Sequence, residues 1–298
     1  MLSFLQVFKT EFLIVSPNGW ICVITLQVVC SWWLFFEHTI IIREMKKAKK
    51  IFLIVFILFL TVIILISIPE NRKSIKTTHF TFLFSSSIDT TKIIELSNAL
   101  ESNYLKIGND LKTTPADNIE TNVYAQRWRY IKATKNWGGS GNIEGISKMH
   151  FVEQAWGETD NKKVAVHEFA HTVTLKLLLD HEPQPLNSKE FDKKFSTFPT
   201  WLWEGISVYE AQQFIDPKTL PYFNNGQYPS IAELNNRLKG GKIYSCGFTI
   251  IEYILSKYGQ EKFIKLIENY GDLKTTFNVT EEKFCNEWYE FVKTNYLQ

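Results

Sequence analysis

Residues 167–171 read His-Glu-Phe-Ala-His, and this motif constrains the fold more than any other feature of the chain. Residues four apart lie on the same face of a helix, so the imidazoles of His167 and His171 can bind one metal ion together. Glu168 is rotated by about 100° from His167 on such a helix. Its carboxylate can then reach a water molecule on the metal without becoming a ligand. The motif therefore predicts two zinc ligands and a general base on one helical turn.

The flanking residues support a helix at this position. Asp160 and Asn161 are suitable N-cap residues, and residues 162–180 contain neither glycine nor proline. The alternative is a buried helix whose histidines only form hydrogen bonds with their neighbours. Two histidines at this spacing around a glutamate favour the metal site over that alternative.

A catalytic zinc site needs a third protein ligand and leaves its fourth position to water. The candidate is Glu204, 33 residues after His171, in the sequence Trp-Leu-Trp-Glu-Gly. Pro199 and Thr200 form a suitable helix start, and Gly205 allows another helix to approach closely. The alternative is a surface glutamate on an amphipathic helix. The apolar neighbours favour burial instead, and a buried carboxylate needs a compensating cation.

The motif at 167–171, together with Trp-Leu-Trp-Glu-Gly-Ile-Ser-Val-Tyr-Glu at 201–210, resembles the gluzincins. These are the thermolysin-like and aminopeptidase-like zinc peptidases of the peptidase MA-like superfamily. The resemblance implies an α+β, thermolysin-like zincin domain, with a small N-terminal sheet and its helices, a zinc helix and a helical C-terminal subdomain. It also implies the site residues: zinc ligands His167, His171 and Glu204, and catalytic base Glu168.

The chain departs from the family pattern at two points. Trp203 stands where many aminopeptidases have an asparagine before the glutamate ligand, and no G-A-M-E-N-type segment occurs upstream. The hydrolytic core is therefore supported, whereas aminopeptidase specificity is not. A tyrosine often stabilises the oxyanion in this family. Tyr244 is the first candidate and Tyr209 the second, although packing is the more common role for either ring.

The residues before the zinc helix predict a strand–helix–strand–strand order. The strands are expected at His79–Ser85, near Asn122–Ala133 and at Ser147–Ala155, the helix from Thr90 to Leu111 after an Asp89 N-cap, and a Gly-rich turn at Lys135–Gly145. By resemblance, the strand around Lys148–Val152 would be the edge that pairs with an extended substrate, or else a strand covered on both sides. His150 is expected to be structural or substrate-facing. Further helices are expected at Ser230–Leu238, Tyr244–Tyr258, Gln260–Tyr270 and Thr280–Tyr296.

Residues 51–68 contain no charged side chain and reach the length of a transmembrane helix. No small-residue cleavage site follows, so we expect an uncleaved anchor. Four lysines within residues 46–50 predict that its start faces the cytoplasm and that the C-terminal domain is outside. A second apolar stretch, Gly19–Phe36, would be a first transmembrane helix, unless Met45 is the true start. The expected domains are a leading segment (1–50), the anchor (51–68), a stem (69–78) and a zinc metallopeptidase domain (79–298).

These features together predict a zinc metallopeptidase of the cell membrane, with an extracytoplasmic catalytic domain and a protein or peptide substrate. No basic stripe marks a nucleic-acid surface, because 33 basic residues balance 31 acidic ones. The alternatives are a catalytically inactive, zinc-containing surface binding module and a zinc hydrolase with a non-peptide substrate. Lys162, Lys163 and Lys176 disfavour an intramembrane protease. Cys246 and Cys285 could be bonded to each other or remain buried thiols, and the oligomeric state stays open.

Overall fold

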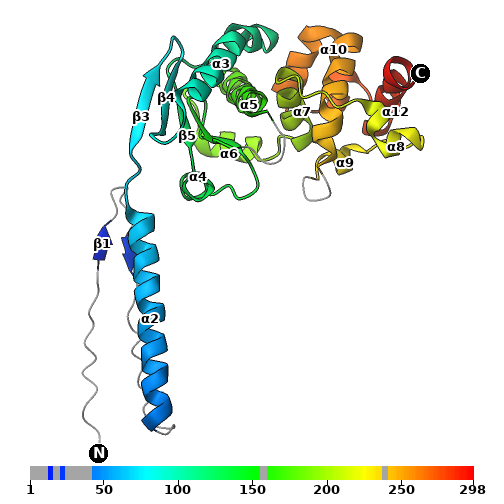
Figure 1. Cartoon of the computed structure of the whole chain (residues 1–298). Coiled ribbons are helices and arrows are strands. Elements are labelled where there is room, and N and C mark those ends of the chain that lie inside the picture. The colour runs from blue at the N-terminus through cyan, green and yellow to red at the C-terminus, as the bar shows by residue number, and fades with distance from the viewer. Residues whose placement is uncertain (1–12, 16–20, 24–41, 155–159, 237–240) are drawn as a thin grey trace, which may run out of the picture. The chain divides into compact units, whose positions relative to one another are not determined.

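The computed structural model describes residues 13–15, 21–23, 42–154, 160–236 and 241–298. The chain divides into two compact units, Met1–Pro69 and Glu70–Gln298. In the first unit, β1 (Leu13–Val15) pairs antiparallel with β2 (Ile21–Val23), and α2 (Ile42–Ser67) is a long helix (Figure 1). Within the described ranges, no helix has both the length and the apolar character needed to cross a membrane. Of the stretch Gly19–Phe36, only Ile21–Val23 is described, as a strand, and the remainder lies outside the described residues.

A five-stranded sheet forms one layer of the second unit, which makes the fold a mixed α+β fold as predicted. The strand order is β3-β4-β5-β7-β6. The neighbouring pairs β4–β5 and β5–β7 are parallel, while β3 and β6 are antiparallel edge strands. The bounds are Arg72–Lys76 for β3, Phe80–Ser85 for β4, Ile119–Tyr124 for β5, Gly141–Ile143 for β6 and Lys148–Val152 for β7.

Three details of this sheet differ from the sequence predictions. Residues 72–76, expected in a stem, form β3, because backbone pairing with β4 does not require apolar side chains. The expected strand near Asn122–Ala133 is wrong after Tyr124, since Arg127–Thr134 forms helix α4 and buries Tyr130 beneath it. The expected Gly-rich turn contains the short strand β6.

Helices α3 (Thr90–Asp110) and α5 (Asn161–His181) lie together beside the sheet (Figure 1). Both begin as predicted, because the side chains of Asp89 and Asp160 accept hydrogen bonds from backbone N–H groups in the first turn. The alternating Phe80, Phe82 and Phe84 of β4 are buried in the same core as these helices. The zinc helix of the sequence prediction is therefore a buried helix against the sheet.

The second half of this unit is helical, as predicted. Its helices are α6 (Ser188–Phe195), α7 (Thr200–Glu210), η1 (Pro217–Thr219), α8 (Pro221–Asn224), α9 (Ile231–Leu234), α10 (Lys242–Glu268), α11 (Leu273–Phe277), α12 (Glu281–Val292) and the π-helical η3 (Lys293–Leu297). The two helices expected on either side of Gly259 form α10, with a kink at that glycine, whose φ is 77°. Of the helix expected over 230–238, the structure has α9, and residues 237–238 lie outside the described residues. Cys246 and Cys285 are buried free thiols.

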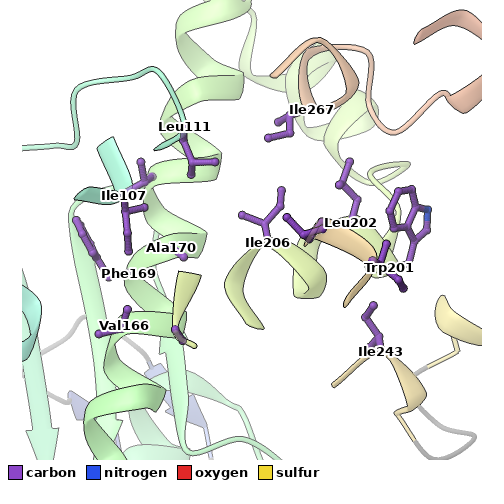
Figure 2. Packing of buried hydrophobic residues seen from close by; sticks show 14 of the residues in the cluster. Ile107, Leu111, Val166, Phe169, Ala170, Trp201, Leu202, Ile206, Ile243 and Ile267 are labelled. Atoms are coloured by element: carbon purple, nitrogen blue, oxygen red, sulfur yellow. The ribbon is translucent and has the colours of Figure 1, made fainter. Parts of the chain in front are cut away.

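Side chains from α3, α5, α7 and α10 point toward one another in the core (Figure 2). Helix α7 contributes Trp201, Leu202 and Ile206, all of which are almost completely buried. Glycines let α7 and α10 approach, because a Cβ added at Gly247 would meet the Gly205 Cα at 3.0 Å. This packing fixes α7 between α10 and α5, and so fixes the position of any side chain that α7 directs toward α5.

Candidate metal centre

His167 and His171 lie one turn apart on α5, and both are buried. Their ring centroids are 4.7 Å apart, and the ring planes are nearly perpendicular at 87°. The helix places both rings on the side that faces α7, as the four-residue spacing predicts. Two imidazoles that converge on one point from neighbouring turns can serve as a pair of metal ligands.

Glu204, near the start of α7, brings a carboxylate to this pair. Its Oε2 lies 3.1 Å from Nε2 of His167 and 3.7 Å from Nε2 of His171. The three side chains offer ligand atoms that all lie within 4.8 Å of one another. In a tetrahedral zinc site with bonds of about 2.0–2.1 Å, ligand atoms are about 3.3 Å apart. The two distances from Glu204 Oε2 to the histidine Nε2 atoms lie on either side of that value, so the residues present fit a zinc ion.

Hydrogen bonds fix the orientation of both imidazoles. Nδ1 of His167 lies 2.9 Å from Oε1 of Gln213, and Nδ1 of His171 lies 2.8 Å from Oγ of Ser207. An Nδ1–H group that donates to these oxygens leaves each Nε2 lone pair directed toward the Glu204 carboxylate. Trp203 adds a stacking contact to His171, with 4.3 Å between ring centroids and 9° between the planes.

The charge of Glu204 is stabilised inside the protein. Burial would raise the pKa of this carboxyl, but hydrogen bonds and charge attraction from His167 and His171, when their imidazoles are protonated, outweigh burial and hold the pKa well below its usual range. A buried carboxylate of this kind needs positive charge beside it. A divalent cation between the three side chains would supply that charge.

Glu168, the predicted base, is half-buried and lies next to β6. A Cβ built on Gly141 would meet Glu168 Cγ at 2.4 Å and Oε1 at 2.6 Å, so the glutamate occupies space that only glycine leaves open. The Gly141 carbonyl accepts hydrogen bonds from Tyr130 Oη (2.6 Å) and Asn136 Nδ2 (3.2 Å). Burial raises the pKa of Tyr130, and the nearby Glu168 raises it further. Tyr130 therefore remains a donor to Gly141.

The two tyrosine candidates lie in different surroundings. Tyr244 is 42% exposed, and its ring centroid is 6.4 Å from that of His167. Tyr209 packs against Phe248 with 5.0 Å between ring centroids. Tyr244 is thus the tyrosine that the structure brings beside the histidine pair. His150 is buried, and its ring nitrogens lie 3.1 Å from Tyr124 Oη and 3.3 Å from Glu144 Oε2, which indicates a structural role.

Of the two alternatives for the strand at Lys148–Val152, the structure has the covered strand and not the edge. Strand β7 (Lys148–Val152) has β5 on one side and β6 on the other, so it is covered on both sides. The edge next to Glu168 is β6 instead, because β6 pairs antiparallel with β7 and, among the described residues, no strand pairs with its other side. Sequence reasoning also missed Gln213, Ser207 and Gly141. Ser207 could have been found from its position, since it lies one helical turn after Glu204.

No family model and no curated protein matches this sequence. Several solved structures do match. A mutant M1 zinc metallopeptidase from Deinococcus radiodurans is 11% identical with a TM-score of 0.39, and a two-domain M1 zinc metallopeptidase mutant bound to L-arginine is 12% identical with a TM-score of 0.37. Each of these matches covers 74% of this chain and 52% of the other. An aminopeptidase N family protein from Idiomarina loihiensis is 13% identical with a TM-score of 0.35, over 75% of this chain and 41% of the other.

The chain thus spans about half the length of the first two solved structures it matches. All three TM-scores are below 0.5. The chemistry of the site rests on the geometry of its own side chains.

Proposed function

We propose that this protein is a zinc-dependent metallopeptidase of the gluzincin type. The observation that carries the proposal is the convergence of the His167, His171 and Glu204 ligand atoms within 4.8 Å, with Glu168 on the same turn of α5. In the described part of the chain, this cluster has three members. Three protein ligands leave the fourth position of a tetrahedral zinc ion for water, whereas structural zinc sites are closed by four protein ligands.

In this proposal each residue of the site has a separate role in cleavage. Glu168 accepts a proton from the attacking water and passes it to the amine that leaves the cleaved peptide bond. Zinc, when bound, makes that water more acidic and polarises the scissile carbonyl. Tyr244, whose ring centroid is 6.4 Å from that of His167, would donate a hydrogen bond to the oxygen of that carbonyl as negative charge develops there. Gln213 and Ser207 hold the two imidazoles so that the ligand set stays in register with Glu168.

A catalytically inactive zinc-binding module is the second candidate, and the position of Glu168 disfavours it. A site that serves only stability has no use for a carboxylate beside its ligands. Glu168 is nevertheless accommodated by a glycine at position 141, where any other residue would displace it. This arrangement is expected for a group that must reach a reacting molecule.

We further propose that the protein is held in the cell membrane by residues 51–68, with the domain from residue 79 onward outside the cytoplasm. The support is the uncharged run of 18 residues and the four lysines that precede it. The substrate would then be a protein or peptide outside the cytoplasm.

The test compares the purified full-length chain with Glu168→Gln and with the control variant Glu261→Gln, which alters an exposed glutamate of α10. Bound zinc is measured by mass spectrometry and cleavage by release of peptides from casein. We expect stoichiometric zinc in all three proteins, cleavage by wild type and Glu261→Gln, and a loss of at least about 100-fold in Glu168→Gln. Equal cleavage by Glu168→Gln, or zinc in every protein without any cleavage, would refute the peptidase.

A further inference from the structure

Helix α4 and the loop after it form a basic surface that bears tryptophan, which we call the α4 surface (residues 126–138). Between residues 121 and 143 the chain contains four basic residues and no aspartate or glutamate. The basic residues are Arg127, Arg129, Lys132 and Lys135. This segment therefore has a net charge of +4, although the whole chain is nearly neutral.

Two tryptophans of this surface are exposed. Trp128 is 40% exposed and Trp137 is 75% exposed. Trp128 and Lys132 lie four residues apart on α4 and so share a face, while Tyr130 is buried on the opposite side. Aromatic residues and arginine are enriched at interaction surfaces relative to the rest of a protein surface, so exposed aromatic rings beside basic side chains indicate an interaction surface.

The exposure of Trp137 does not come from a loose loop. Asn136 Oδ1 accepts hydrogen bonds from the backbone N–H groups of Gly138 (3.1 Å) and Gly139 (2.9 Å). Arg127 Nη1 donates to the Gly139 carbonyl at 2.8 Å. Hydrogen bonds thus hold the loop on both sides of Trp137, and a ring presented in this way loses little conformational entropy on binding.

The α4 surface lies next to the residue with which the second unit begins, Glu70. Arg129 Nε is 3.7 Å from Oε1 of Glu70. In the sequence, Glu70 follows Ile68, the last residue of the uncharged run, by two positions. The Glu70 carboxylate also accepts a hydrogen bond from Ser85, which ties this short connection to the sheet.

We propose that the α4 surface binds the anionic phospholipid headgroups of the bilayer that holds residues 51–68. Tryptophan is enriched at the level of the headgroups, and lysine and arginine are attracted electrostatically to anionic lipids in whichever leaflet contains them. The inference depends on the proposed membrane attachment and not on the peptidase chemistry. Binding of the α4 surface to lipid would bring the candidate metal centre close to the bilayer, because the loop of this surface continues into β6, whose Gly141 lies against Glu168. Substrates would then be cleaved close to the membrane surface.

The experiment uses the full-length chain with a benzophenone amino acid in place of Trp137. The control carries the same group in place of Leu105, which is 67% exposed on α3. Each protein is mixed with vesicles of phosphatidylcholine, either alone or with phosphatidylglycerol, and is floated on a density gradient. After illumination, lipid adducts are counted by mass spectrometry. We expect adducts at position 137 in the anionic vesicles and few at position 105.

Charge reversal provides the second arm. The double variant Lys132→Glu/Lys135→Glu should lower the adduct yield at position 137 by at least about fivefold. The matched control is Lys189→Glu/Lys193→Glu on the exposed face of α6, which should leave the yield unchanged. Three outcomes would overturn the α4 surface proposal alone. They are flotation without adducts at position 137, equal adduct yields at positions 137 and 105, and adducts to protein in place of lipid. Failure to float with either vesicle would overturn it together with the membrane attachment, while casein cleavage reports separately on the peptidase.

Discussion

Replacing Gly141 by alanine should displace the catalytic base while sparing the metal ligands. The new Cβ would lie 2.4 Å from Glu168 Cγ, and ordinary van der Waals contact begins at 3.4 Å, so the glutamate must move by about 1 Å. A misplacement of about 1 Å at a reacting centre can lower the rate about 100-fold, which corresponds to about 2.7 kcal/mol. The zinc ligands come from α5 and α7, so zinc binding should persist.

The assay measures kcat and KM for a fluorogenic peptide that the wild type cleaves, together with bound zinc. We expect Gly141→Ala to lower kcat about 100-fold with KM and zinc content close to wild type. Gly138→Ala is the matched control, because a Cβ at position 138 meets nothing within 4 Å. The reasoning is refuted if Gly141→Ala keeps the wild-type kcat, or if both variants lose activity equally.

Three further predictions concern the surroundings of the site. Gln213→Leu and Ser207→Ala should each weaken zinc binding about 10- to 100-fold in competition with a chelator, because each removes the partner of a ligand's Nδ1; unchanged affinity in both would contradict this. Tyr244→Phe should lower kcat about 100-fold at constant KM if its hydroxyl stabilises the oxyanion, and an unaltered kcat would assign the ring to packing. Burial raises the pKa of Glu210 to about 7 despite its ion pair with Lys106. The native state therefore holds this proton more tightly than the unfolded chain, in which the carboxyl has its ordinary pKa of 4.5. The resulting stabilisation is present below that value and is lost as the pH rises through about 7. Urea unfolding across this range should show a loss of at most about 3 kcal/mol in wild type relative to Glu210→Gln; identical pH dependence of the two proteins would refute it.

The sequence predicted the helices of the site because their signals are local. Asp160 caps α5, and Pro199 precedes α7, so the starts of both helices could be read from neighbouring residues. The four-residue spacing of His167 and His171 then determined which face they share. Local signals do not show that α5 packs against α7, and that expectation came from the resemblance to the gluzincins.

The missed features depend on contacts between distant segments. Arg127, Trp128, Arg129 and Tyr130 alternate between basic and aromatic side chains, a pattern that predicts a strand. The structure has a helix here, and Tyr130 of this helix packs against Tyr124 of β5, a contact that the local sequence does not reveal. Strand β6 comes before β7 in the sequence, but in the sheet it is the edge strand next to β7. Its three residues, which begin with a glycine, contain no local signal for a strand at this position. Gln213 reaches His167 from 46 residues away, after α7 has ended. Its role follows from the path of the chain and not from a motif.

Zinc content tests the central claim most directly. Glu204 and Glu210 are both buried glutamates of α7, but only Glu204 faces the two histidines, while Glu210 pairs with Lys106. We therefore compare zinc bound to Glu204→Gln and to Glu210→Gln after identical dialysis. The account predicts stoichiometric zinc in wild type and Glu210→Gln and a clear deficit in Glu204→Gln. Full retention of zinc by Glu204→Gln with wild-type affinity would contradict it.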